Sequence, residues 1–193
     1  MAYRSVRPRG TDLPDNYRLH STLDPKKDAR AVTTIKVSFA LIVAAMIVLA
    51  LVLDLPFESA FNAGVLTAIT VAACLVYMVV HELTHAALLW WLTRERPTVA
   101  VRFPYLVTGS QAVLTRSTAV VVALTPLVLY TLVLLDLLRT LPTSFFLTVY
   151  VVLVLNVAGS VGDVLQAHAF VRLPAAALIR DDGEETSVFL PMA

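Results

Sequence analysis

The pentapeptide His81-Glu82-Leu83-Thr84-His85 places three chemically reactive side chains within an otherwise apolar stretch. Residues four apart lie on the same face of a helix, so His81 and His85 can present their imidazole nitrogens to one metal ion. Glu82 lies beside the first histidine, where its carboxylate could accept a proton from a metal-bound water without being a ligand itself. The spacing therefore predicts a zinc ion that is held by two histidines and activates water.

The surroundings of this motif favour a metal site over its alternatives. The pattern can also arise by chance, or as a polar patch that lines a helix interface. Residues 65–80 before it and 86–92 after it are almost entirely apolar. An ionisable residue near the centre of a membrane-spanning helix costs about 2.5–3.5 kcal/mol on insertion scales. A cluster of three such residues is more easily explained by a metal than by an incidental polar patch.

The third zinc ligand must come from elsewhere in the chain, because catalytic zinc sites use three protein ligands and a water. Asp163 and His85 lie equally far from the ends of their predicted helices, so we expect them at the same depth. Gly159 and Gly162 precede Asp163 and would allow close helix packing. His168 is the rival ligand, although it lies nearer the interface, where a histidine is commonly hydrogen-bonded or snorkelling. We favour Asp163.

Four other residues have weaker claims on the site. Asn156 lies two turns before Asp163 on about the same face, and could donate to a developing oxyanion; an interhelical hydrogen bond is the alternative. Tyr77, one turn before His81, could contact that ligand, but we favour an ordinary core aromatic. Cys74 is too far from the motif to share its zinc, and is expected to be a packed thiol. His20 lies in the polar N-terminal region and is expected to take no part.

The composition is that of an integral membrane protein. Of the 193 residues, 58% are apolar and 15% are charged, whereas soluble domains are about 45–50% apolar. The excess is gathered into runs that predict four membrane-spanning helices. These are residues 35–53, 60–92, 118–138 and 145–170. A net charge of +1 gives no reason to expect a nucleic-acid partner, and a single cysteine excludes an internal disulfide.

The charges near the first helix predict the orientation of the chain. Basic residues outnumber acidic ones up to the start of the first apolar run, which places the N-terminus in the cytoplasm by the positive-inside rule. With four spans, both termini of this multi-pass protein of the cell membrane are expected to be cytoplasmic. We therefore divide the chain into a polar N-terminal tail at 1–33, a membrane domain at 34–171 and a cytosolic C-terminal tail at 172–193. A short strand is expected at 17–23, where apolar and polar residues roughly alternate.

Two features around the third span bear on the fold. Residues 98–103 alternate with strand period, Gly109-Ser110 can turn, and residues 111–115 can return, which predicts a hairpin or paired extended loop on the cytoplasmic side. A plain surface loop is equally compatible with 97–115. Pro126 is expected to bend the third span and to free a backbone carbonyl, which a pocket or neighbouring helix must satisfy. The predicted fold class is an all-α membrane protein with about four helices and this short insert.

These residues together resemble a known family. The membrane-embedded HELTH helix, the extended insert, the proline-bent helix and a last helix with Asn156 and Gly162-Asp163 are similar to the small four-span zincin peptidases. More broadly they resemble the site-2 protease group of intramembrane zinc metalloproteases. The flanking segments Leu13-Pro-Asp-Asn-Tyr17 and Arg172-Leu-Pro174 fit the small family less specifically. The chain lacks the Asn-x-x-Pro and Leu-Asp-Gly sequences of the larger group. The resemblance implies zinc held by His81, His85 and Asp163, with Glu82 as general base.

The first functional hypothesis is a zinc metalloendopeptidase that cuts a membrane protein or peptide in or near a membrane segment. Its partners would be that substrate and the lipid bilayer, with the oligomeric state left open. One alternative is a non-catalytic membrane scaffold in which zinc or a polar cluster joins helices. Another is a zinc hydrolase that acts on a lipid-like substrate.

Overall fold

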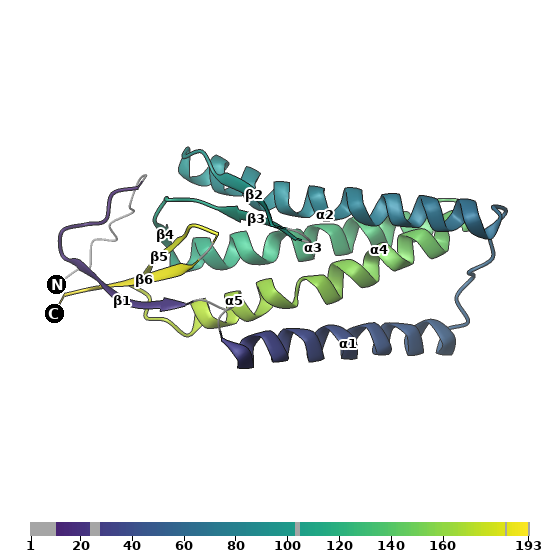
Figure 1. The fold of residues 1–193 in the computed structure, drawn as a ribbon, viewed down its shortest axis with the longest axis horizontal. Coiled ribbons are helices and arrows are strands. Elements are labelled where there is room, and N and C mark those ends of the chain that lie inside the picture. Colours follow the sequence, from purple (N-terminus) through teal and green to yellow (C-terminus); the bar gives the residue numbers. More distant parts are fainter. Residues whose placement is uncertain (1–10, 24–27, 103–104, 184, 193) are drawn as a thin grey trace.

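Four long apolar helices run side by side, and short strands gather at one end of them (Figure 1). The computed structural model describes residues 11–23, 28–102, 105–183 and 185–192. The first three helices are α1 (Ala29–Val52), α2 (Ala63–Thr93) and α3 (Arg116–Thr140). The fourth consists of a 3₁₀ turn, η1 (Thr143–Phe145), followed by α4 (Phe146–Gly159) and α5 (Val161–Val171). All four are long and apolar enough to cross a membrane, so the four predicted helices are confirmed.

Polar side chains mark where these helices begin. Asp28 accepts a hydrogen bond from the backbone N–H of Arg30 at 2.8 Å, and Asn62 accepts one from Val65 at 3.0 Å. Such caps satisfy backbone donors that have no partner within the helix. Helix α2 ends at Thr93, and the next residue, Arg94, adopts a left-handed conformation with φ 64°. The motif helix is therefore defined at both ends by local sequence.

The last predicted span is not continuous. Helix α4 ends at Gly159, and α5 starts at Val161 after a break at Ser160. Glycine is a poor helix former, and Gly159 and Gly162 flank the break. Asp163 consequently lies in the first turn of a new helix, where the positive end of the helix dipole favours a carboxylate. The break gives Asp163 a setting that an uninterrupted helix could not provide.

Helix α4 is the centre of the bundle. It packs against α1, α2 and α3, whereas α1 packs mainly against α4 and α5. One buried cluster consists of Leu134 of α3 with Val149, Val152 and Leu153 of α4. Many large apolar side chains of α1 and α2 instead face outward, such as Leu51 at 72% exposure. An apolar outer surface of this kind is compatible with a multi-pass membrane protein.

The two terminal segments, together with β4, form a sheet. The fold is therefore mostly helical, and the predicted all-α class is wrong in this respect. The four-stranded antiparallel sheet has the order β1-β6-β5-β4. Its strands are β1 (Tyr17–Leu23), β4 (Leu114–Thr115), β5 (Leu178–Asp181) and β6 (Thr186–Pro191). The strand expected at 17–23 is confirmed, and Tyr17 pairs with Pro191. The segments expected to be tails are thus joined to each other, while the division at 1–33, 34–171 and 172–193 stays a prediction.

The predicted hairpin exists, but its second strand differs from the expectation. Strand β2 (Thr98–Arg102) pairs with β3 (Tyr105–Gly109), and residues 103–104 between them lie outside the described part. Gly109 and Ser110 form a junction with the larger sheet instead of a turn. The N–H of Ser110 donates to the Asp181 carbonyl at 2.7 Å, and a Cβ at Gly109 would overlap the Asp182 backbone. Residues 114–115, expected to return to 98–103, pair with β5 for this reason.

Candidate metal centre

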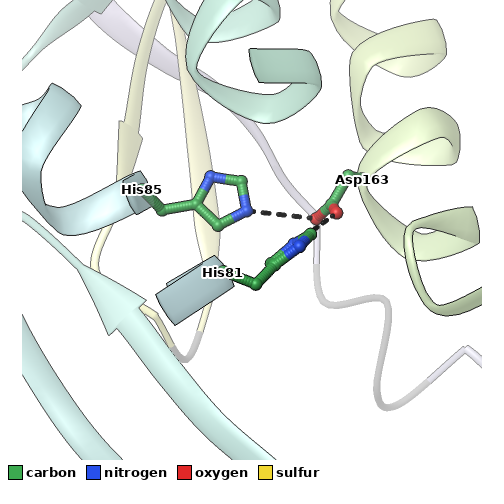
Figure 2. A group of neighbouring side chains, drawn as sticks. All are labelled: His81, His85 and Asp163. Atoms are coloured by element: carbon green, nitrogen blue, oxygen red, sulfur yellow. Dashed lines mark hydrogen bonds and ion pairs between the residues drawn. The ribbon is translucent and has the colours of Figure 1, made fainter. Parts of the chain in front are cut away.

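His81, His85 and Asp163 converge from two helices (Figure 2). The Nε2 atom of His81 lies 3.3 Å from Asp163 Oδ2, and Nε2 of His85 lies 3.7 Å from Asp163 Oδ1. One possible ligand atom from each residue lies within 4.8 Å of the other two. Zinc–nitrogen and zinc–oxygen bonds of about 2.0–2.2 Å place neighbouring ligand atoms of a tetrahedral site about 3.3–3.6 Å apart. The three side chains therefore have a spacing that zinc can use.

Helix geometry brings the two histidines to one face of α2. His81 and His85 are four residues apart on α2 and point to the same side, toward α5. Their side chains are only 11% and 12% exposed, and that of Asp163 is 23% exposed. The three side chains are therefore largely shielded, and Asp163 is the most exposed of them.

His85 is oriented by a backbone carbonyl that the proline of α3 makes available. Its Nδ1 lies 3.0 Å from the carbonyl oxygen of Val122. Pro126 lies inside α3, and because it has no N–H it cannot hydrogen-bond to the residue four positions earlier, which is Val122. A carbonyl can only accept, so the His85 Nδ1 carries a hydrogen, and in the neutral imidazole Nε2 then has the lone pair on the side of Asp163. The carbonyl that we expected the proline to free therefore orients a predicted ligand.

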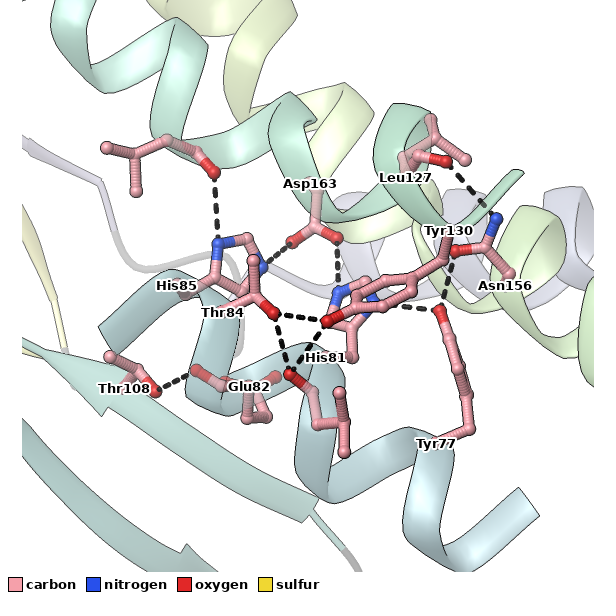
Figure 3. Close-up of polar contacts among 12 residues, drawn as sticks. Tyr77, His81, Glu82, Thr84, His85, Thr108, Leu127, Tyr130, Asn156 and Asp163 are labelled. Carbon is pink, nitrogen blue, oxygen red and sulfur yellow. Dashed lines mark hydrogen bonds and ion pairs between the residues drawn. The ribbon is translucent and has the colours of Figure 1, made fainter. Parts of the chain in front are cut away.

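His81 is held by side chains instead. Its Nδ1 lies 2.8 Å from the hydroxyl of Tyr77, and that hydroxyl donates to Asn156 Oδ1 at 2.6 Å (Figure 3). Asn156 also donates from Nδ2 to the Leu127 carbonyl at 3.2 Å and to Thr131 Oγ1 at 2.8 Å. These contacts join α2, α3 and α4. Both interpretations of Tyr77 describe the structure, because its hydroxyl contacts His81 and the residue packs against the apolar cluster around Leu134.

The contacts of Asn156 bear on its predicted catalytic role. Its side chain is fully buried, and Nδ2 donates to two acceptors within the protein. In this arrangement neither amide hydrogen is available to an oxyanion. The alternative of an interhelical hydrogen bond describes the observed contacts, and donation to an oxyanion stays a prediction.

Glu82 lies where the hairpin meets the motif helix. Its side chain is partly buried, and its backbone carbonyl accepts a hydrogen bond from Thr108 Oγ1 of β3 at 3.2 Å (Figure 3). Strand β3 therefore runs beside the motif, which the sequence did not indicate. The role of Glu82 as general base stays a prediction.

The remaining candidates lie outside the group. His168 is exposed in the last turn of α5, and His20 is exposed on β1. Among the described residues, the cluster that could hold a metal contains Asp163 and not His168. Cys74 packs, partly buried, against the apolar cluster around Leu134, as expected of a packed thiol.

Two further polar groups near the site had no clear signal in the sequence. The Tyr130 hydroxyl lies 2.5 Å from Thr84 Oγ1, which connects α3 to the motif (Figure 3). Asp181 of β5 accepts hydrogen bonds from Gln166 Nε2 at 2.5 Å and Thr186 Oγ1 at 3.1 Å. Burial raises the pKa of Asp181 above its usual range, although its hydrogen bonds oppose the rise. Gln166 lies one turn beyond Asp163, so this contact fastens the sheet to the helix that carries the third ligand.

The comparison with known families agrees with this geometry. Residues 74–178 match the model of a family described as "Putative zincin peptidase". The matched segment extends from α2 to the start of β5 and includes the whole cluster of His81, His85 and Asp163. No curated protein and no solved structure matches the chain.

Proposed function

The chain belongs to the zincin peptidase family, and from this premise we propose that it is a zinc metallopeptidase that cleaves a peptide bond in or near a membrane segment. The observation that carries the proposal is the convergence of two imidazoles and a carboxylate, those of His81, His85 and Asp163, within 4.8 Å of one another. Nε2 of His85 lies 3.7 Å from Asp163 Oδ1, and Nε2 of His81 lies 3.3 Å from Asp163 Oδ2. The donor set therefore fits a divalent cation, and zinc suits two imidazoles and a carboxylate.

In this reaction the residues of the site would have distinct roles. Zinc, when bound by His81, His85 and Asp163, supplies a Lewis acid that polarises a carbonyl and makes water more acidic. Glu82, next to His81 on α2, accepts the proton of the attacking water and passes it to the departing amine. The carbonyl of Val122 and the hydroxyl of Tyr77 keep the two imidazoles in place. The low exposure of His81, His85 and Asp163 limits the access of bulk water to the site.

The substrate class follows from the surroundings of the cluster. The motif lies within α2, one of four helices that are apolar enough to cross a membrane. A peptide that reaches it would come from a membrane protein or another membrane-embedded segment. Strand β3 lies beside Glu82, so an extended substrate could pair with the β2–β3 hairpin by strand addition. Similarity to the site-2 protease group, location in the cell membrane and a cytoplasmic position of both chain ends are parts of this proposal.

The test uses the purified full-length chain in liposomes with a panel of labelled single-span peptides. The wild type is expected to cleave some of them, and mass spectrometry of the products locates the cut bond. Glu82→Gln should keep stoichiometric zinc and lose turnover, whereas His81→Ala should lose the zinc. Cleavage retained by Glu82→Gln would refute its role as base. Zinc bound with no peptide cut would favour the scaffold, and phospholipid breakdown would favour the lipid hydrolase.

A further inference from the structure

The hydroxyl of Tyr77 lies between Asn156 and His81 and contacts both. It is 2.6 Å from Asn156 Oδ1 and 2.8 Å from His81 Nδ1. Tyr77 and His81 are one turn apart on α2, whereas Asn156 belongs to α4. A ligand of the candidate metal centre is thus connected to the middle of the bundle through two side chains.

The chemistry of the partners determines which way each hydrogen bond runs. The Leu127 carbonyl lies 3.2 Å from one end of the Asn156 amide and can only accept, so the nitrogen must be at that end. The amide oxygen therefore faces Tyr77 and must receive its hydrogen. Because a phenol has one hydrogen, the Tyr77 oxygen can only accept from His81 Nδ1.

The same reasoning extends to the face of His81 that meets Asp163. A neutral imidazole carries one hydrogen, and here Nδ1 has it. Nε2 is then left with a lone pair, and this atom is 3.3 Å from Asp163 Oδ2. His85 reaches the same state through the Val122 carbonyl. The two histidines thus have different Nδ1 hydrogen-bond acceptors, and both acceptors favour the same Nδ1–H tautomer.

We propose that Tyr77 and Asn156 are positioning residues that hold His81 in the Nδ1–H tautomer and keep its Nε2 available to zinc. The inference rests on the zinc site of the proposed function but not on its peptidase activity. Neither residue touches the metal position. Asn156 acts on His81 only through the direction in which the Tyr77 hydroxyl points.

This dependence predicts effects that do not add. Tyr77→Phe removes the acceptor of His81 Nδ1, and loss of such an outer contact typically lowers metal affinity about 10–100-fold. Asn156→Leu frees the Tyr77 hydroxyl to donate to His81 Nδ1, which moves the imidazole hydrogen to Nε2, where it opposes the metal. We expect a comparable loss from Asn156→Leu. The double variant should bind zinc no more weakly than Tyr77→Phe, because without the hydroxyl Asn156 has no route to His81.

Tyr150→Phe is the matched control. Tyr150 is another tyrosine of the bundle, buried where Tyr77 is partly buried, and its hydroxyl donates to the Met46 carbonyl at 2.6 Å. That bond joins α4 to α1 and involves no residue of the candidate metal centre. The control loses the same chemical group and one hydrogen bond of similar length, so it reports the general cost of such a loss.

The experiment measures zinc affinity of the detergent-purified full chain by competition with a chelating dye, and the absorption spectrum of the cobalt-loaded form. We expect a 10–100-fold loss and an altered cobalt spectrum for Tyr77→Phe, and neither for Tyr150→Phe. Equal losses in these two variants, or losses that multiply in the double variant, would overturn the proposal.

A second readout does not depend on the variants folding. In zinc-loaded wild-type protein labelled with ¹⁵N-histidine, NMR should show His81 with its hydrogen on Nδ1 and the metal on Nε2, and a hydrogen on Nε2 with the metal on Nδ1 would contradict the relay. A wild type that binds zinc but cuts no peptide would sink the peptidase proposal while leaving this one standing. A wild type that does not bind zinc would overturn both.

Discussion

Replacing Pro126 with alanine should strengthen the fold and weaken the metal centre at the same time. Pro126 leaves the Val122 carbonyl without a donor inside α3, and His85 Nδ1 takes that place at 3.0 Å. Alanine restores an N–H at position 126. This N–H would compete for the same carbonyl and loosen the contact that orients His85.

The two effects have magnitudes that can be separated. Alanine is about 3 kcal/mol more favourable than proline inside a helix. Pro126 is fully buried, so removing two buried methylene groups costs about 1.6 kcal/mol of stability. The apo protein is therefore expected to gain about 1.4 kcal/mol in its free energy of unfolding. Loss of an outer contact to a ligand lowers zinc affinity about 10–100-fold, which is about 1.4–2.7 kcal/mol in the opposite direction.

The assay compares thermal unfolding of the apo protein with zinc affinity by chelator competition. Pro126→Ala should unfold at a higher temperature and bind zinc more weakly than the wild type. Pro142→Ala is the control, because Pro142 precedes η1 at a helix boundary and frees no carbonyl to a ligand. Unchanged zinc affinity in a stabilised Pro126→Ala variant would refute the idea that the proline orients His85.

Three further outcomes are expected. Asp163→Ala should remove the stoichiometric zinc that His168→Ala keeps, as elemental analysis would show; the reverse result would make His168 the third ligand. Gly109→Ala should destabilise the protein by about 1–3 kcal/mol in thermal unfolding because its Cβ would overlap the Asp182 backbone, whereas Gly162→Ala, where a Cβ meets nothing within 4 Å, should not. The raised pKa of Asp181 means that the folded state binds this proton more tightly than the unfolded state. Its contribution to the free energy of unfolding is therefore fully present below about pH 3.9, and it is lost as the pH rises through the folded-state pKa. The melting temperature of wild type relative to Asp181→Asn should therefore fall from about pH 4 upward, and a rise would contradict the assignment.

The sequence predicted those features that depend on local periodicity. The apolar runs located the four helices, because a helix of about 20 apolar residues can be recognised without knowledge of its neighbours. Likewise, the spacing of His81 and His85 brings them together by helix geometry alone. The strand at 17–23 was visible as an alternation, but its partner was not. That partner, β6, lies at the opposite end of the chain.

The break at Ser160 was missed because apolar composition continues across it. The register of the hairpin was also missed, since the sequence offered Gly109-Ser110 as a turn. These residues serve as a junction because the β5–β6 turn packs against them, and that packing brings together segments far apart in the chain.

The sequence by itself determined the chemistry of the candidate metal centre: two imidazoles on one helix face, a neighbouring carboxylate in Glu82, and an apolar setting in which an incidental polar cluster is energetically costly. Depth along the helices was enough to nominate Asp163. Only the tertiary structure decided how the ligands are held, because the Val122 carbonyl and the Tyr77–Asn156 pair act across helix interfaces. A residue's type and spacing state what it can bind, whereas the direction of its hydrogen bonds depends on which helices pack against it.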